Sequence, residues 1–200
     1  MTSLGSFTPT YDNNGNLLND NVHSHAWDAD SRPTTLDGVS LTFDALDRMV
    51  EEKWPSGYIS QIPYAPTGAK LGYMQGQSLV LGFIPLPGGA MAVYLNSPGS
   101  IGNHYRHNDW LGSTRLTSSP SQAFIASLAY APFGEPYEVS SGKADVSFTG
   151  QYNGTLGNTM YDFPYREFPI QGRWPSPDPA GLAAVNPTNP QSWNRRVAQT

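Results

Sequence analysis

Hydrophobic and aromatic residues occur along this chain in short runs, and the runs are separated by glycine, proline, asparagine and aspartate. Short apolar runs bounded by turn residues predict β-strands rather than helices. Between residues 8 and 53 the pattern predicts consecutive hairpins, with tight turns at Asn14-Gly15 and Asp37-Gly38. Strands with longer turns are expected to continue from 54 to 150. Because no long stretch has helical apolar periodicity, we expect an all-β fold.

The composition of the chain changes beyond about residue 150, where proline, asparagine and aromatic residues follow one another without a regular period. We expect an irregular, compact segment there. Further upstream, Gly88-Gly89 predicts a hairpin turn rather than a phosphate-binding loop, because no helix is expected to follow it.

Three aromatic–acid dipeptides, Tyr11-Asp12, Trp27-Asp28 and Phe43-Asp44, recur at a spacing of 16 residues. A fixed period indicates one structural unit copied along the chain. Counting from the aromatic, the fifth positions are Gly15, Ser31 and Asp47, and the sixth positions are Asn16, Arg32 and Arg48. We expect the aspartate to accept backbone N–H bonds of the turn, and the arginine to pair with an aspartate of the neighbouring unit. The aromatics are expected to stack across neighbouring strands.

Composition narrows the classes of function. Gly 20 and Pro 18 are abundant for 200 residues, whereas charged residues supply only 14%. The net charge of −5 argues against a nucleic-acid surface, which requires clustered Lys and Arg. The absence of cysteine excludes disulfides and thiolate metal sites. No apolar run approaches the roughly 20 residues of a membrane span, and residues 1–10 lack the pattern of a signal peptide.

The motifs are specific enough to resemble a known family. The 16-residue units resemble the YD repeats of the RHS (rearrangement hotspot) family, with looser copies at Tyr64–Gly68 and at Tyr130–Gly134. The stretch His107–Arg115 is similar to the family's HxDxLGSxR motif. Tyr130–Gly134, Phe148–Gln151 and Gly172–Leu182 match the RHS-associated core domain in order and approximate spacing. The resemblance covers about residues 8–195.

The resemblance implies a strip of β-hairpins that coils into a hollow shell, with the core domain as a plug. It divides the chain into a YD-repeat region, 8–103, and a core domain, 104–195. The repeat-motif residues are Tyr11, Asp12, Gly15, Trp27, Asp28, Arg32, Phe43, Asp44, Arg48, Tyr130 and Gly134. The core-motif residues are His107, Asp109, Leu111, Gly112, Ser113, Arg115, Gly172, Arg173, Trp174, Pro179 and Gly181.

In function, the resemblance implies a non-catalytic structural part of a bacterial protein that encapsulates and delivers a C-terminal toxin or effector. The expected partners are that toxin segment or the rest of a longer shell, and the expected location is secreted or at the cell surface. We expect the chain to be the C-terminal end of a shell or a truncated product. Open strand edges would favour self-association. No cofactor, nucleic-acid partner or membrane span is expected.

A pair of carboxylates is the sharpest candidate for chemistry. Some RHS proteins release their C-terminal segment by self-cleavage with two acids beside an arginine, and two close carboxylates sharing a proton supply both acid and base. The matching residues are Asp178, Glu167 and Arg166. This chain departs from the family pattern in two ways. Glu167 stands where the family has Asp, and the segment 166–173 is one residue shorter than the family's usual run. The structural alternative is that Asp178 caps the turn before Pro179, while Glu167 pairs with Arg166 or Arg173.

Other candidates have a structural explanation. His104, His107 and Asp109 are spaced loosely like metal ligands, but on a strand 104 shares a face with 106 rather than 107. His23 and His25 share a strand face and are expected at a solvated rim. Ser113 lacks the strand-to-helix elbow of hydrolase nucleophiles. Binding of carbohydrate by exposed repeat aromatics, in a surface adhesion module, is a further alternative to packing within the sheet.

Overall fold

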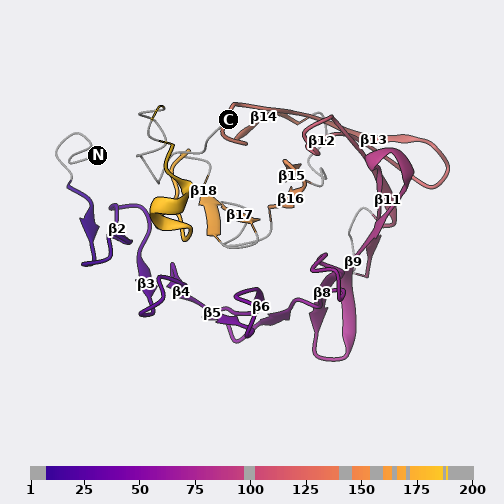
Figure 1. Ribbon diagram of the computed structural model, residues 1–200. Helices are drawn as coiled ribbons and strands as arrows, with labels where there is room; N and C mark the ends of the chain where they lie inside the picture. Colours follow the sequence, from indigo (N-terminus) through magenta and orange to yellow (C-terminus); the bar gives the residue numbers. More distant parts are fainter. Residues whose placement is uncertain are drawn as a thin grey trace. The chain divides into compact units, whose positions relative to one another are not determined.

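The computed structural model describes residues 8–96, 102–139, 146–153, 160–163, 166–169, 172–186 and 188 (Figure 1). Over these ranges the regular elements are β-strands and two short 3-10 helices, η1 (Pro87–Gly89) and η2 (Gly181–Ala184). The predicted all-β class is therefore confirmed.

Most strands belong to one antiparallel sheet of 12 strands, and their order in the sheet is their order in the chain (Figure 1). The first six are β3 (His25–Trp27), β4 (Pro33–Leu36), β5 (Val39–Phe43), β6 (Met49–Lys53), β7 (Ile59–Gln61) and β8 (Gly72–Gln75). The next six are β9 (Ser78–Pro85), β10 (Met91–Leu95), β11 (His104–Asn108), β12 (Thr114–Ser118), β13 (Phe124–Tyr130) and β14 (Pro136–Val139). Strands that are neighbours in the sequence are therefore neighbours in this sheet.

Three hairpins lie outside the large sheet. The first joins β1 (Thr10–Tyr11) to β2 (Leu17–Asn19). The other two are β15 (Ser147–Phe148) with β16 (Gln151–Tyr152), and β17 (Met160–Phe163) with β18 (Arg166–Pro169). The C-terminal segment that was expected to be irregular thus contains two short hairpins, and the described chain between them has no regular strand.

The chain forms two compact units. One comprises residues 1–58 and 154–200, and the other comprises 59–153. These units are defined by compactness, whereas the boundary at 103/104 was inferred from sequence motifs, so that boundary stays a prediction.

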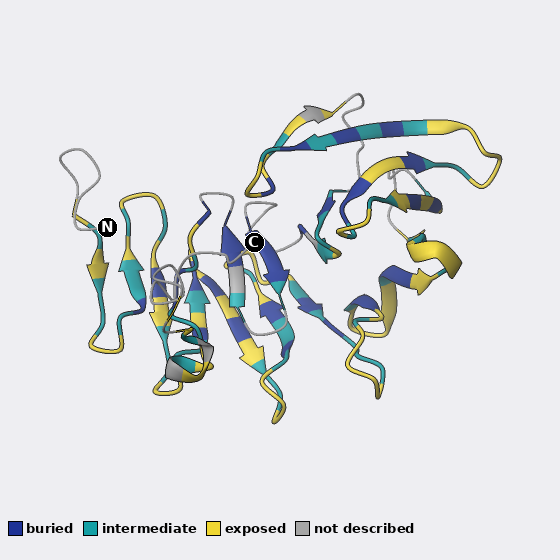
Figure 2. Cartoon of the chain, turned by 45° about the horizontal axis from the view of Figure 1, so that its top comes forward, coloured by how far each residue is buried: buried dark blue, intermediate teal, exposed yellow. Residues whose placement is uncertain are grey.

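Burial alternates along the strands, as expected when one face of a sheet is covered. In β5 the side chains of Val39 and Leu41 are buried, whereas those of Ser40 and Thr42 are exposed. Figure 2 shows buried and exposed positions alternating along several strands. The buried positions include polar and charged groups, among them Glu52, His104, Arg106 and Thr117. The covered face is therefore mixed in character.

The turn between β4 and β5 has the conformation that its sequence predicts. Asp37 and Gly38 both have positive φ, at 48° and 82°, and Leu36 pairs directly with Val39. Two consecutive residues with positive φ define the hairpin turn that matches the right-handed twist of the strands. The prediction from Asp37-Gly38 is confirmed.

Two glycines let β8 and β9 approach each other closely. Gly72 pairs with Gly82, and Gly72 has φ +154°. A Cβ at Gly72 would overlap the backbone carbonyl oxygen of Leu81 and would contact the Cα of Gly82. Backbone atoms within a ladder have little room to move, so this position requires glycine.

We predict that Gly72→Ala lowers the free energy of unfolding by about 2–4 kcal/mol, through overpacking and backbone strain together. The matched control is Gly76→Ala in the turn that follows β8. Gly76 also has positive φ but has open space around the added methyl group, so its cost should be only about 1–2 kcal/mol. Urea unfolding of both variants measures the difference, and equal losses would contradict the overlap at Leu81.

Candidate functional site

One five-residue turn recurs in both compact units. The N–H of its first residue donates to the carbonyl of the fifth, and the N–H of the fourth donates to the carbonyl of the first. This pattern occurs at residues 12–16, 28–32, 44–48, 54–58, 65–69, 109–113, 119–123 and 131–135. The fourth residue always has positive φ, as in Gly15, Ser31, Asp47, Gly57, Gly68, Gly112, Gln122 and Gly134. Looser sequence repeats thus share one backbone geometry with the strict ones.

Aspartate at the first position completes four of these turns. Asp28 Oδ1 accepts the amides of Asp30 and Arg32, each at 2.9 Å. Asp44, Asp12 and Asp109 bond in the same way to the amides of their own turns. The predicted capping of turn N–H groups by aspartate is confirmed.

The stretch around Asp109, predicted to be a separate core motif, is one more copy of the repeat turn. The shared signal was present in the sequence. Asp109 is followed by Gly112 at the fourth position of the turn, as Asp12 is followed by Gly15. Its spacing from the earlier copies is not a multiple of 16 residues, so it lies outside the regular period.

Side chains at the sixth repeat position join consecutive units. Each arginine bonds first to its own aspartate, Arg32 Nε to Asp28 at 2.7 Å and Arg48 Nε to Asp44 at 2.8 Å. Arg32 also reaches the next unit, where Nη1 donates to Asp47 Oδ1 at 2.8 Å. The neighbouring-unit pairing predicted for arginine is confirmed at Arg32, but the bond within its own turn was missed.

Asn16 replaces arginine in the first unit and keeps the same two contacts. Its Nδ2 donates to Asp12 Oδ2 at 2.8 Å and to Ser31 Oγ at 3.0 Å. In both steps the sixth residue of one unit bonds to the fifth residue of the next. We call this series of contacts, from Asn16 to Ser31 and from Arg32 to Asp47, the turn ladder.

The turn bonds also explain the acidity of the aspartates. The Arg48 side chain and amide hold the pKa of Asp44 below its ordinary value. For Asp109, partial burial by itself would raise the pKa, but the Ser113 amide and Arg115 outweigh it and leave the pKa lowered. The carboxylates remain ionised at neutral pH as structural acceptors.

The repeat aromatics are half-buried, and Trp27 has specific partners. Its indole N–H donates to the carbonyl of Leu17 at 2.7 Å, and its ring lies edge-on to His25 with centroids 6.1 Å apart. Trp27 thus packs against its own hairpins, which favours a structural role over stacking on a sugar.

His25 differs from its expected position. The ring was expected at a solvated rim, but His25 is only 7% exposed, on the covered face of β3. The ring of His23 stacks on it at 6.1 Å with an interplanar angle of 13°. The short strand spacing identified the shared face, but which face is covered depends on tertiary packing.

Two core motifs contact each other through their turns. The N–H of Thr149 donates to Ser113 Oγ at 2.9 Å, and the N–H of Gly150 donates to the carbonyl of Gly112 at 3.0 Å. Ser113 is 1% exposed. Its hydroxyl accepts a turn amide in a closed junction, a position that suits a structural acceptor better than a nucleophile.

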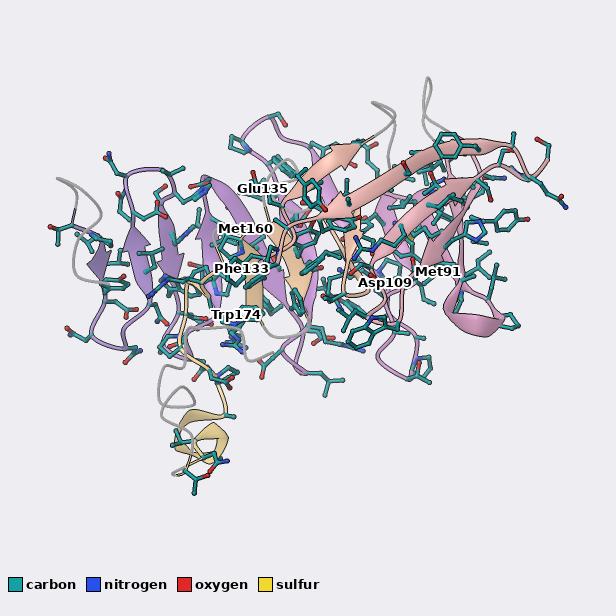
Figure 3. The ribbon with its side chains drawn as sticks, turned by 90° about the horizontal axis from the view of Figure 1, so that it is seen from above. Met91, Asp109, Phe133, Glu135, Met160 and Trp174 are labelled. Atoms are coloured by element: carbon teal, nitrogen blue, oxygen red, sulfur yellow. The ribbon has the colours of Figure 1, made fainter. Side chains whose placement is uncertain are left out.

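The remaining residues of the His107–Arg115 motif surround this junction. Arg115 Nε donates to Asp109 Oδ2 at 2.8 Å, and its guanidinium lies over the Tyr130 ring at 5.5 Å. Tyr130 is buried against Phe148, with ring centroids 5.5 Å apart. His107 is exposed and bonds to Ser118, while Leu111 is exposed at the turn; Asp109 is labelled in Figure 3.

The predicted catalytic residues lie around β18. Arg166 Nη2 donates to Asp178 Oδ2 at 3.0 Å, and its guanidinium stacks 4.0 Å from the centre of the Trp174 ring, which is labelled in Figure 3. Burial lowers the pKa of Arg166, and the Asp178 carboxylate opposes that effect. The register of β17 and β18 pairs Glu167 with Asp162. The Glu167 side chain lies outside the described residues, so the dyad stays a prediction.

Asp178 has the contacts expected of a turn cap. Its Oδ1 accepts the amide of Ala180 at 2.9 Å, and its carbonyl accepts the amide of Gly181, where η2 begins. Gly172 has φ +76° and closes the turn after β18 with a bond to the carbonyl of Pro169. Arg173 and Pro179 are exposed.

One backbone bond ties this C-terminal segment to the first hairpin. The N–H of Leu17 on β2 donates to the carbonyl of Pro175 at 2.8 Å. Pro175 and Ser176 are buried, as is Asn16 beside Leu17. Leu17 therefore uses its N–H for the C-terminal segment and its carbonyl for Trp27.

The described parts of the chain contain no group of three or more His, Asp or Glu side chains placed to hold a metal ion. Nor do they contain a helix long and apolar enough to cross a membrane.

Comparison with known proteins rests on solved structures, because no protein-family model and no curated protein matches the chain. The Photorhabdus luminescens Tc holotoxin pore, with a substitution in TccC3, matches 94% of this chain at 16% identity and a TM-score of 0.67. The TcdB2-TccC3-TEV structure matches 86% at 16% identity and 0.64. The fold is RHS-like. TcdB2-TccC3-Cdc42 also matches, over 90% of this chain at 17% identity and 0.52.

This chain spans about a tenth of the length of the solved chains it matches, 10% in the first two cases. At these identities the likeness establishes the fold. Role, activity, cargo and partners need separate arguments.

We predict that Ser113→Ala lowers the free energy of unfolding by about 1–2 kcal/mol, because the Thr149 amide loses its buried acceptor. Gly112→Ala should cost more. Its φ is +87°, and an added Cβ would lie 3.0 Å from the Gly150 nitrogen. Ser121→Ala at an exposed turn is the control, expected within about 0.5 kcal/mol of the parent. Urea unfolding checks all three, and a Ser113 variant as stable as the control would contradict the junction.

Proposed function

We propose that this chain is part of the wall of an RHS-type shell that encloses a toxin or effector segment, and that it has no catalytic role in that wall. The observation that carries the proposal is the 12-stranded sheet of sequence-adjacent strands with an RHS-like fold. A wall of this kind grows by adding hairpins at one edge, since each new hairpin covers the open edge of the last.

The use of polar groups supports a structural role. In the repeat turns the carboxylates of Asp12, Asp28 and Asp44 accept turn amides, and Arg32 and Arg48 bond to them. Ser113 and Asp109 are likewise engaged within and between turns. The side chains that a catalytic site would need free are bonded into the scaffold.

The proposed partners are the enclosed segment and the remainder of a longer shell, in a secreted or surface-located bacterial complex. The matched structures are described as complexes of TcdB2 with TccC3 and as a holotoxin pore. Those descriptions belong to the matched proteins, and they make a toxin complex the best-supported setting for this chain.

Limited proteolysis of the full gene product tests enclosure. We expect an interior segment to survive trypsin under native conditions and to be cleaved after the wall is opened in urea. Gly72→Ala, which overlaps the backbone of the neighbouring wall strand, should expose that segment at lower urea than the parent does. Gly76→Ala, with its smaller loss of stability, should expose it at a urea concentration between those of Gly72→Ala and the parent. If mass spectrometry shows every segment digested at one rate under native conditions, the enclosure proposal is wrong.

A second candidate is self-cleavage near the C-terminal segment, favoured by the bond between Arg166 and Asp178. The arginine and one acid of the implied arrangement lie together there. Asp178→Asn should abolish fragmentation of the full gene product on denaturing gels if Asp178 acts chemically. Asp30→Asn, at an exposed turn acid, is the control. Unchanged fragmentation in Asp178→Asn would leave Asp178 as a turn cap.

A further inference from the structure

His25 is the first residue of β3, and His23 lies two residues before it on the loop from β2. His25 is 7% exposed, and its Nδ1 has no hydrogen-bond partner. The ring of His23 stacks on one side of it, and the ring of Trp27 lies edge-on to it, each with centroids 6.1 Å away. Directly across the strand pair is Leu36, an apolar neighbour on β4. A proton on His25 would place a charge in this covered site.

The charged groups near His25 come from two turns. Asp37, in the β4–β5 turn, bonds to His23 Nδ1 at 2.5 Å and to the Ser24 amide at 2.6 Å. Asp20 accepts the His23 amide at 2.6 Å. Both carboxylate oxygens of Asp37 are therefore engaged, Oδ2 by His23 Nδ1 and Oδ1 by the Ser24 amide. His25 and a protonated His23 would be like charges in stacked rings.

A continuous series of contacts leads from this pair to the C-terminal segment. His25 touches Trp27, the Trp27 indole donates to the carbonyl of Leu17 at 2.7 Å, and the Leu17 N–H donates to the carbonyl of Pro175 at 2.8 Å. Every residue of the series lies in the same compact unit. Displacing the Trp27 ring would break its bond to the Leu17 carbonyl. The Leu17 residue would then be disturbed, and its N–H is the group that bonds to the Pro175 carbonyl.

We propose that the His23–His25 pair is an acid-sensitive switch that controls, through Trp27 and Leu17, whether Pro175 stays docked on β2. While His25 is uncharged, the series of contacts is intact. At acid pH the proton on His25 separates the stacked rings, moves Trp27 and releases Pro175. The device concerns residues 17–37 and 175 alone, and it does not depend on the proposed shell role.

The direction of the pH effect follows from the burial of His25. Burial is the main cause that lowers the pKa of His25 below its ordinary value of 6.5. The unfolded chain therefore binds the proton more readily than the folded chain. The stability contributed by neutral His25 is complete above about pH 6.5 and is lost as the pH falls toward the lowered pKa of the folded state.

Hydrogen exchange of the full chain at pH 7.5 and pH 5.0, corrected for the intrinsic rate of exchange, tests the switch. We expect the protection of the Leu17 amide to fall about tenfold or more at pH 5.0, since one pKa unit of coupling corresponds to a factor of ten. Amides of β9 and β10 should keep their protection. Equal protection of Leu17 at both pH values would overturn the proposal, and so would a uniform loss over all strands.

Variants separate the roles along the series. His25→Phe should keep the Leu17 amide protected at pH 5.0, and so should His25→Gln, a second uncharged replacement. The control is His107→Gln at an exposed position, which should respond to pH like the parent. Trp27→Phe should lower Leu17 protection already at pH 7.5, because the indole N–H bond is lost. A pH response that persists in both His25 variants, or an unaltered Leu17 amide in Trp27→Phe, would show the switch to be wrong.

Discussion

The structure depends on how each hairpin turn satisfies its own backbone. A five-residue turn leaves amides that point into the loop, and an unpaired amide is costly where the neighbouring chain excludes water. Aspartate at the first position accepts two of these amides and so closes the loop with one side chain, as Asp28 and Asp44 do. The left-handed fourth residue then directs the chain back along the next strand. Because each of these five-residue turns is closed by its own backbone, the same unit can be repeated along the sheet.

The turn ladder turns a series of local units into a continuous edge. Arg32 bonds within its own turn and to Asp47 of the next, so the same side chain completes one unit and positions another. Exposed ion pairs contribute little individually, but a planar guanidinium shared by two carboxylates restricts the register between neighbouring turns. Asn16 retains both contacts with a shorter, neutral side chain. It is buried beside Leu17 and Pro175, where an arginine would bring an additional charge into a covered site.

The C-terminal segment combines the first repeat and β18 in one compact unit. Trp174 lies between Phe163, Phe168 and the Arg166 guanidinium, and Asp178 completes the charge pair. The Pro175 carbonyl accepts a hydrogen bond from the N–H of Leu17 on β2. These contacts join parts of the chain that are far apart in sequence.

Local chemistry made part of this molecule predictable. Short apolar runs, Asp37-Gly38 and the repeated aromatic–acid dipeptides determined strands, turns and the all-β class, because each depends on neighbours within a few residues. The same reasoning placed His23 and His25 on one face of a strand. Only the tertiary structure decided that this face is covered, that Ser113 meets Thr149, and that Arg166 takes Asp178 as its partner. Burial and long-range pairing depend on which surfaces pack together, and residue spacing along the chain carries no record of that.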